Sequence, residues 1–296
     1  MQRTDLALEA SELAEQKTVD GVSTESETRN GLSINRIKIT NENGAAVIGK
    51  PCGVYTTIEM TPFTDSSFKV DARVEAVAEE LSSLLPPEGT ILVIGIGNHF
   101  ITPDALGPKT TESVLATRHI SGEIARSAGL EGLRSVAVIS PGVLGQTGIE
   151  LIEIIKSLCQ NLNPSAVIAI DALASRRLGR LGCTVQISDS GISPGAGVGN
   201  NRPKINEETV GVPVISIGVP TVVDAVTLMT DVAETVGLDS EVADKLQASS
   251  SPRGENMIVT PREIDLLIER SSRLIALAVN SALHPAYDPL DLISAV

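Results

Sequence analysis

Two aspartates follow short apolar runs that have the composition of buried strands. Asp104 lies in the loop 102-TPDALGPK-109, which comes after 91-ILVIGIG-97, and Asp171 directly follows 166-AVIAI-170. Two carboxylates in a partly dry cleft tend to hold one proton between them, because adjacent negative charges repel. The ionised member can take a proton from water while the protonated member polarises a carbonyl, which indicates hydrolytic chemistry. A turn role for Asp104 and a helix-capping role for Asp171 would explain the same spacing.

A nucleotide-binding module is one alternative. Gly95 and Gly97 begin a dinucleotide fingerprint in 95-GIGNHF-100, but Phe100 takes the place of the third glycine. The stretch 142-GVLGQTG-148 lacks the GK[ST] of a triphosphate-binding loop. A tight turn after a strand explains the two glycines better than a cofactor does.

A serine hydrolase is the second alternative. Ser193 lies in a GxSxG motif, and Asp224 or Asp265 followed by His284 would complete the order of an α/β-hydrolase triad. The motif needs a helix directly after the serine, and Pro194 with the glycines behind it disfavours one.

Metal and cofactor sites have little support in the sequence. His99, His119 and His284 are the only histidines, and no two of them have the spacing of a ligand pair. We therefore expect neither a metal nor a cofactor.

The elements that must position the aspartates can be read from the alternation of apolar runs with amphipathic stretches after Ile91. This alternation predicts βαβ units and a mainly parallel sheet with helices on both faces. We expect strands near residues 91–96, 136–139, 166–170, 183–187 and 213–219. Because the loops that follow parallel strands emerge at one edge of the sheet, Asp104 and Asp171 should converge there.

The regions outside this core give weaker signals. Residues 1–30 are polar and aperiodic, so we expect an exposed N-terminal arm ahead of a single α/β domain over 31–296. Two short strands are expected at 34–40 and 53–60, a helix at 70–84, and a mobile loop near 239–256. Three threonines placed three residues before an acid predict capping boxes that start helices, in 147-TGIE-150, 221-TVVD-224 and 260-TPRE-263.

Composition excludes several classes of protein. The 296 residues carry a formal net charge of −14, which disfavours direct nucleic-acid binding. The apolar runs are too short to span a membrane, and the first twenty residues are too charged for a signal peptide. Cys52, Cys159 and Cys183 are odd in number and widely spaced, which favours a reducing compartment such as the cytoplasm.

At 93-VIGIGNHFITPDALGPK-109 the sequence resembles the germination proteases of spore-forming bacteria, endopeptidases that degrade small acid-soluble spore proteins. The similarity continues in order through 138-VISPGVLGQTGIE-150, 168-IAIDALASR-176, 185-VQISDSGISPGAGVGN-200, 216-SIGVPTVVDAVT-227 and 257-MIVTPREIDLLIE-269. It therefore covers nearly the whole chain.

The resemblance implies a three-layer α/β/α fold related to the hydrogenase-maturation endopeptidases, a homotetramer, and a precursor that trims its own N-terminus. The family's two essential aspartates fall on Asp104 and Asp171. The family cuts after an acidic residue that precedes an apolar residue and alanine, which implies autoprocessing between Asp5 and Leu6, before Ala7, and a pro-segment of residues 1–5.

These inferences predict a self-processing endopeptidase in the cytoplasm of the spore core that starts the degradation of small acid-soluble spore proteins during germination. We expect no direct contact with nucleic acid or a membrane. The alternatives are a serine hydrolase that uses Ser193 and a nucleotide-binding regulatory module built on Gly95 and Gly97.

Overall fold

The computed structural model describes residues 3–14, 19–65, 69–120, 123, 126, 132–199, 202–237 and 257–294. The loop expected near 239–256 lies outside the described residues.

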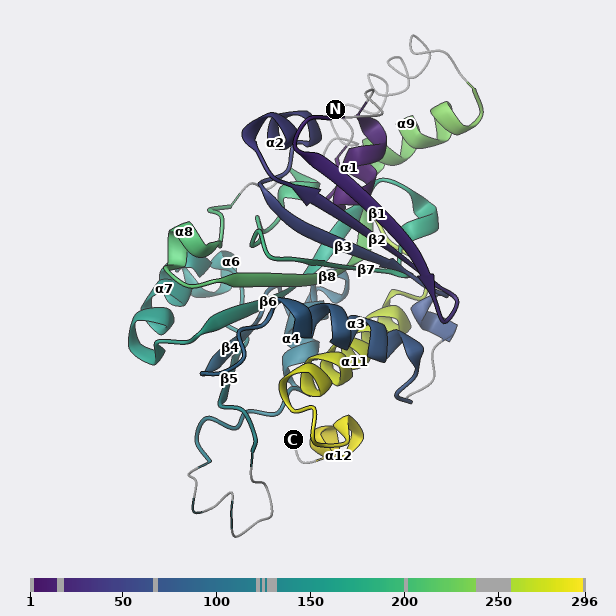
Figure 1. The fold of residues 1–296 in the computed structure, drawn as a ribbon. Helices are drawn as coiled ribbons and strands as arrows, with labels where there is room; N and C mark the ends of the chain where they lie inside the picture. The colour runs from purple at the N-terminus through teal and green to yellow at the C-terminus, as the bar shows by residue number, and fades with distance from the viewer. Residues whose placement is uncertain are drawn as a thin grey trace.

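One mixed sheet forms the centre of the molecule (Figure 1). Its strand order is β1-β2-β3-β7-β8-β6-β4-β5, and β9 pairs with β8. The strands are β1 Val22–Arg29, β2 Leu32–Ile39, β3 Gly53–Glu59, β4 Ile91–Gly95, β5 Val136–Ile139, β6 Ala166–Ser175, β7 Thr184–Ser188, β8 Val214–Asp224 and β9 Ile258–Val259. Strands β8, β6, β4 and β5 run parallel, whereas β7, β3, β2 and β1 extend the sheet in antiparallel order. The predicted strands are confirmed, with a parallel unit at the core of the sheet.

Helices cover both faces of the sheet, which confirms the three-layer α/β/α class (Figure 1). One face packs against α3 Ala72–Leu84, α4 Leu106–Thr111 and α11 Ile264–Leu283; the other packs against α7 Leu151–Leu162 and α8 Glu207–Val210. On this second face α1 Ala7–Leu13 and α2 Glu42–Ile48 cover β2 and β3. Short elements complete the described chain: α6 Leu144–Thr147, α9 Ala225–Thr235, α12 Pro289–Ser294, and the 3-10 turns η1 Phe63–Asp65, η2 Thr102–Asp104, η3 Leu178–Arg180 and η4 Ala196–Val198.

Strand β4 illustrates why its sequence is continuously apolar. Ile91 and Val93 belong to the core beneath α3 and α11, and Leu92 and Ile94 belong to the core beneath α7. Successive side chains of a strand point to opposite faces, so a strand buried on both faces needs an apolar residue at every position.

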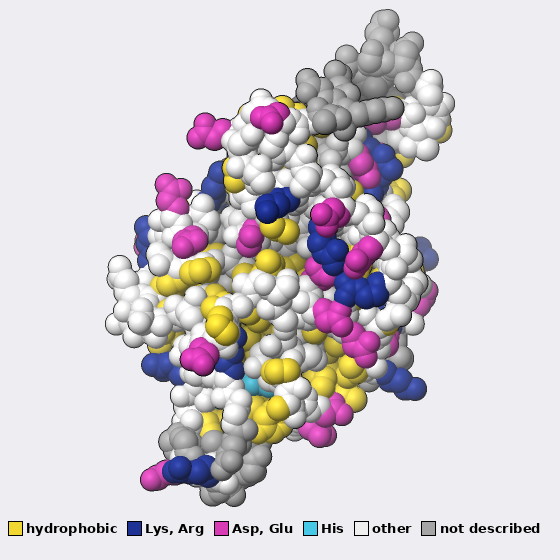
Figure 2. Space-filling model, viewed as in Figure 1, with side chains coloured by type: hydrophobic (Ala, Val, Ile, Leu, Met, Phe, Trp, Pro, Cys, Tyr) yellow, Lys and Arg dark blue, Asp and Glu magenta, His cyan; other side chains and the backbone are white. Residues whose placement is uncertain are grey.

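The N-terminal residues differ from the exposed arm that the sequence predicts. Leu6 and Ala7 are both 0% exposed, and residues 7–13 form α1. Residues 22–29 form the edge strand β1, whose side chains are mostly exposed. Acidic and basic side chains lie close together over this edge (Figure 2). Arg29 and Arg36 form ion pairs with Glu27 and Glu80. A strand that buries little apolar surface has no apolar periodicity, so its sequence resembles that of an arm.

The three predicted capping boxes are also wrong: in each motif the helix begins after the acid and not after the threonine. The residue before each helix is the acid: Glu150 before α7, Asp224 before α9 and Glu263 before α11. The threonine of the middle motif, Thr221, lies in β8, because this strand continues through residues 220–224. Asp224 accepts a hydrogen bond from the amide of Thr227 and therefore caps α9 by itself.

None of the described helices is long and apolar enough to cross a membrane.

Candidate active site

Asp104 and Asp171 line one cleft where β4 ends and the neighbouring β6 continues, so the two aspartates converge as expected, and Asp5 lines the cleft too. Its volume is about 380 Å³. Asp104 comes from η2, the turn that follows β4, whereas Asp171 lies inside β6 rather than after it. The cleft therefore holds three carboxyl groups from three separate segments of the chain.

The loop that carries Asp104 is held close to the end of β4. The backbone amide of Asn98 donates to Asp104 Oδ2 at 2.8 Å, and Thr221 Oγ1 donates to the Pro103 carbonyl at 2.7 Å. A Cβ on residue 97 would lie 2.0 Å from the Asp104 carbonyl oxygen, and Gly97 has φ +121°. Glycine is thus needed at position 97 because the Asp104 loop passes close to its backbone. In a dinucleotide-binding motif a glycine would allow the same close approach to a cofactor.

Asp171 is more deeply buried than Asp104. Its side chain accepts the amide of Ala172 at 2.9 Å, and the residue is 5% exposed. Burial raises the pKa of Asp171 well above the usual aspartate value, and the nearby carboxylates of Asp104 and Asp5 raise it further. Burial also raises the pKa of Asp104, although the Asn98 amide opposes this by stabilising the ionised form. The environment therefore favours a proton on Asp171 and a negative charge on Asp104.

The raised pKa of Asp171 predicts that Asp171→Asn stabilises the protein at neutral pH. Folded Asp171 keeps its proton up to its raised pKa, but in the unfolded chain it loses the proton near 3.8. Between these two pKa values the folded state binds more protons, so the free energy of unfolding falls as pH rises, by about 1.4 kcal/mol for each pH unit in that interval. Asparagine does not ionise, so the variant avoids this loss.

Urea unfolding between pH 4 and pH 8 checks the prediction, with Asp104→Asn as the comparison because it keeps Asp171. The unfolding free energy of Asp104→Asn should fall with rising pH and that of Asp171→Asn should fall less. Parallel pH profiles would contradict the raised pKa of Asp171.

Asp5 forms hydrogen bonds with β6 through both its own backbone and its own side chain. Its amide donates to the Ala174 carbonyl at 2.8 Å, and its Oδ2 accepts the Ala174 amide at 2.8 Å. Burial raises the pKa of Asp5, while the ammonium of Lys50 lowers it. Lys50 Nζ donates to the Thr4 carbonyl at 3.0 Å, so Lys50 also holds the N-terminal segment in place.

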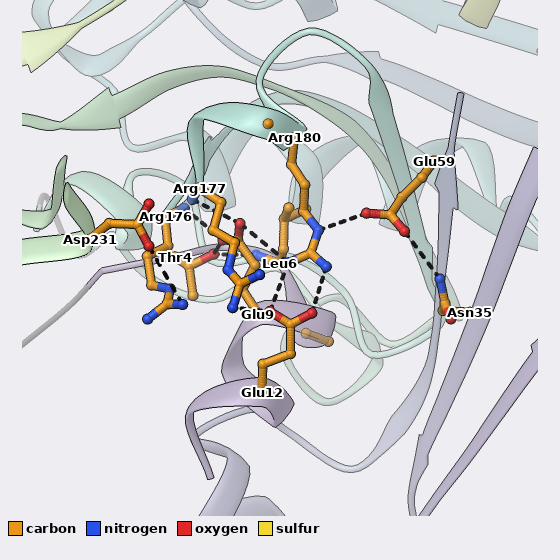
Figure 3. Close-up of polar contacts among 12 residues, drawn as sticks. Thr4, Leu6, Glu9, Glu12, Asn35, Glu59, Arg176, Arg177, Arg180 and Asp231 are labelled. Carbon is orange, nitrogen blue, oxygen red and sulfur yellow. Dashed lines mark hydrogen bonds and ion pairs between the residues drawn. The ribbon is translucent and has the colours of Figure 1, made fainter. Parts of the chain in front are cut away.

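Glu9 is fully buried in a group of arginines beyond the end of β6 (Figure 3). Its two oxygens accept the backbone amides of Arg176 at 2.6 Å and Arg177 at 3.0 Å. Arg180 lies 3.6 Å from Glu9 and forms two hydrogen bonds with Glu12, at 2.9 and 2.5 Å. The N-terminal segment is thus fixed both at Asp5 and one helical turn beyond it.

The triad of the serine alternative is not assembled. His284 accepts the amide of Arg134 through Nδ1 at 3.3 Å, and Asp224 binds Thr227 at the start of α9. Within the described residues no hydrogen bond joins Ser193 to an aspartate or a histidine. The segment after Ser193 forms a three-residue 3-10 turn rather than a helix.

In the described part of the chain, no three His, Cys, Asp or Glu side chains are placed to hold a metal ion together.

Several residues that shape the cleft have no signal in the sequence motifs. Glu9 lies in the polar N-terminal stretch, and Lys50 is a single charged residue within 45-AAVIGKPCGV-54. Thr221 fits a capping box, and Gln186 is a single polar residue within a strand. Gln186 alone was detectable, since a polar side chain between Val185 and Ile187 in a strand buried on both faces requires a partner.

Comparison with known proteins identifies the family. A model of the germination protease family matches residues 2–238. A germination protease from Caldanaerobacter subterraneus subsp. tengcongensis is 44% identical over 308 residues, spanning 96% of this chain and 94% of that protein. A germination protease from Priestia megaterium is 36% identical over 351 residues, spanning 97% of this chain and 94% of that protein.

Among solved structures, the NiFe hydrogenase maturation protease HycI from Thermococcus kodakarensis KOD1 aligns with 68% of this chain and 98% of its own, at 18% identity and a TM-score of 0.35. The family match spans most of the chain and includes both cleft aspartates, and the relatives align over nearly their full length. The chain therefore belongs to the germination protease family and is a protease.

Proposed function

We propose that the chain is a self-processing, aspartate-dependent endopeptidase that starts the degradation of small acid-soluble spore proteins during germination. The observation that carries the proposal is the N-terminal segment: Asp5 lies in the same cleft as Asp104 and Asp171, in the sequence Asp5-Leu6-Ala7 expected for a cut. Following the family, we place the enzyme in the spore core as a homotetramer.

In this proposal the two aspartates divide the work by their protonation. Asp104, whose ionised form the Asn98 amide stabilises, takes a proton from a water molecule that attacks the Asp5 carbonyl carbon. Asp171 gives its proton to the leaving nitrogen of Leu6, so the pair again holds one proton in total after the cut. The products are a new carboxyl group on residue 5, which then releases its proton to water, and a new amine on Leu6.

The same segment supplies a reason for the inactivity of the precursor. Residues 3–9 are held along the cleft by contacts with β6, α9 and Lys50. The amide of Arg3 donates to Thr227 of α9, and Asp5 binds Ala174 of β6 through its backbone and its side chain. The side chain of Glu9 accepts the amide of Arg176, and Lys50 donates to the carbonyl of residue 4. A cleft occupied in this way excludes an external polypeptide. Residues after the cut therefore help to keep the precursor inactive, together with the pro-segment of residues 1–5.

The experiment is to incubate the purified chain with a small acid-soluble spore protein and to identify the new termini by mass spectrometry. We expect cuts after acidic residues in the spore protein and a cut after Asp5 in the enzyme. Intact spore protein after long incubation with enzyme that starts at Leu6 would contradict the proposed substrate.

Glu9→Gln should weaken the docking of the N-terminal segment. An amide has only one accepting oxygen, so one of the buried amides of Arg176 and Arg177 loses its partner, which costs about 1–3 kcal/mol of unfolding free energy. Chemical denaturation in an Asp104→Asn background, where the chain stays uncut, measures the effect. Glu12→Gln is the matched control: it removes a more exposed partner of Arg180 from the same helix and should cost about 1 kcal/mol or less. Equal losses of unfolding free energy in the two variants would show that the backbone amides of Arg176 and Arg177 do not hold Glu9 specifically.

A further inference from the structure

Gln186 contacts the backbone on both sides of the Asp5–Leu6 bond. Its Nε2 donates to the carbonyl oxygen of Asp5 at 3.0 Å, and its Oε1 accepts the amide of Ala7 at 2.7 Å. Both side-chain groups are therefore used, and their orientation is fixed, since a carbonyl can only accept and a peptide N–H can only donate. The residue is 8% exposed, so these hydrogen bonds are largely shielded from water.

The sheet register places Gln186 and Asp171 in one row. Asp171 of β6 and Gln186 of β7 are both paired with Gly218 of β8, the strand between them. Neighbouring strands lie about 4.8 Å apart, so the two backbones are about 10 Å from each other across Gly218. A side chain at position 218 would collide with Leu173 and with the backbone of Asp171, so glycine keeps this row clear.

Both side chains point to the face of the sheet that carries α1. The neighbours of Gln186 in β7, Val185 and Ile187, belong to the opposite core, and Ile170 beside Asp171 does too. Alternation along a strand then directs Gln186 and Asp171 to the other face, where Asp5 lies and where a second cavity is lined by all three residues. The Asp5 carbonyl therefore accepts an amide donor from β7, and the Asp171 carboxyl group of β6 lines the same cavity.

We infer that Gln186 is a catalytic residue of the peptide cleavage, and this inference rests on the proposed function. Its Nε2 hydrogen bond stabilises the negative charge that develops on the carbonyl oxygen when water attacks, as an oxyanion-hole donor does. Its Oε1 accepts the amide of Ala7, and the two hydrogen bonds together fix the position of the Asp5–Leu6 bond relative to the aspartates. Among the hydrogen bonds of the described residues, the one from Gln186 is the only one that reaches the Asp5 carbonyl oxygen.

The test uses wild type and variants expressed from Leu6, so that none depends on its own N-terminal cut, and a synthetic peptide of residues 1–14 of this chain, so that kcat and KM are measured separately. Gln186→Leu removes donor and acceptor and should lower kcat by about 10²–10³-fold, with a much smaller change in KM. Gln186→Glu offers a sharper readout. Its carboxylate cannot donate at neutral pH, but its protonated form has the donor and acceptor pattern of glutamine, so its kcat relative to wild type should recover as pH falls. Gln186→Leu should show no recovery.

Thr57→Val is the matched control. Thr57 is the residue of β3 paired with Gln186, it is buried, and its hydroxyl has no hydrogen-bond partner in the described structure. The valine variant should keep kcat within about twofold of wild type. If Gln186→Leu loses its fold, as judged by circular dichroism, the pH dependence of Gln186→Glu decides alone.

The outcomes separate this inference from the proposed function. Wild-type enzyme that does not cut the peptide between Asp5 and Leu6 would overturn the proposed function. A wild type that cuts, together with Gln186 variants that match its kcat or change only KM, would overturn the catalytic role of Gln186 and leave the proposed function intact.

Discussion

Asp104→Asn and Asp171→Asn should each slow peptide-bond cleavage by about 10²–10⁴-fold, which is the range of one general acid or base. Asparagine is nearly isosteric with aspartate, but it can neither take a proton from water at position 104 nor give one to the leaving amine at position 171. Both variants should fold, because the amide oxygen can still accept the backbone N–H that Asn98 or Ala172 donates. Both variants are expressed from Leu6, because they would not remove their own N-terminal segment. Initial rates on the peptide of residues 1–14, with circular dichroism as the folding check, measure the effect.

The two aspartates act on one reaction, so their losses should not add. The double variant should be about as slow as the slower single variant, as groups that act as a unit usually are. Ser193→Ala is the control, since Ser193 lines the neighbouring cavity without a histidine partner, and it should keep near-normal turnover. Normal turnover by either asparagine variant, or a large loss in Ser193→Ala, would show that the dyad is assigned wrongly.

Asp5→Lys should block N-terminal processing almost completely. The lysine would replace a largely buried carboxylate that accepts the Ala174 amide, and it would bring a second ammonium close to Lys50. A buried, unpaired charge is costly enough that the segment should leave the cleft instead of binding there. Wild-type protein should give the new N-terminus LALEASEL, and the variant should keep its original one, as read by mass spectrometry of the intact chain.

Two controls separate recognition of Asp5 from a general effect of charge. Glu25→Lys makes the same change of charge on the exposed edge strand β1 and should be processed normally. Dilution of the wild type should not change the first-order rate, because Asp5 lies in the cleft of its own chain. A rate proportional to protein concentration would show that one molecule cuts another, and a normal cut in Asp5→Lys would show that the acidic residue is not recognised.

The parallel core and the position of the aspartates could be predicted from the sequence because both follow from local rules. Strands β4 and β6 are buried on both faces, so their continuous apolar runs mark them. The rule that the carboxyl ends of parallel strands meet at one edge then places Asp104 close to Asp171 without knowledge of any contact, although β6 continues past Asp171.

Helix starts show where local patterns fail. Thr221-x-x-Asp224 satisfies the spacing of a capping box, but β8 continues to Asp224 because it pairs with β6 and β9 on its two sides. Pairing with strands distant in sequence thus stabilises the extended conformation more than the four-residue capping motif stabilises a helix start. Thr221 is thereby free to hold the Asp104 loop through Pro103.

The occupancy of the cleft was decided by tertiary structure alone. Residues 1–30 are polar, and polarity by itself predicts exposure, yet Glu9 is buried because amides and guanidinium groups from residues 176–180 satisfy its charge. Likewise, the sequence marks Gln186 only as a polar residue in a buried strand, and the β6-β8-β7 register is what places it in one row with Asp171. Apolar burial leaves a period in the sequence because it repeats along each element, whereas a polar contact between distant segments depends on two single positions and leaves none.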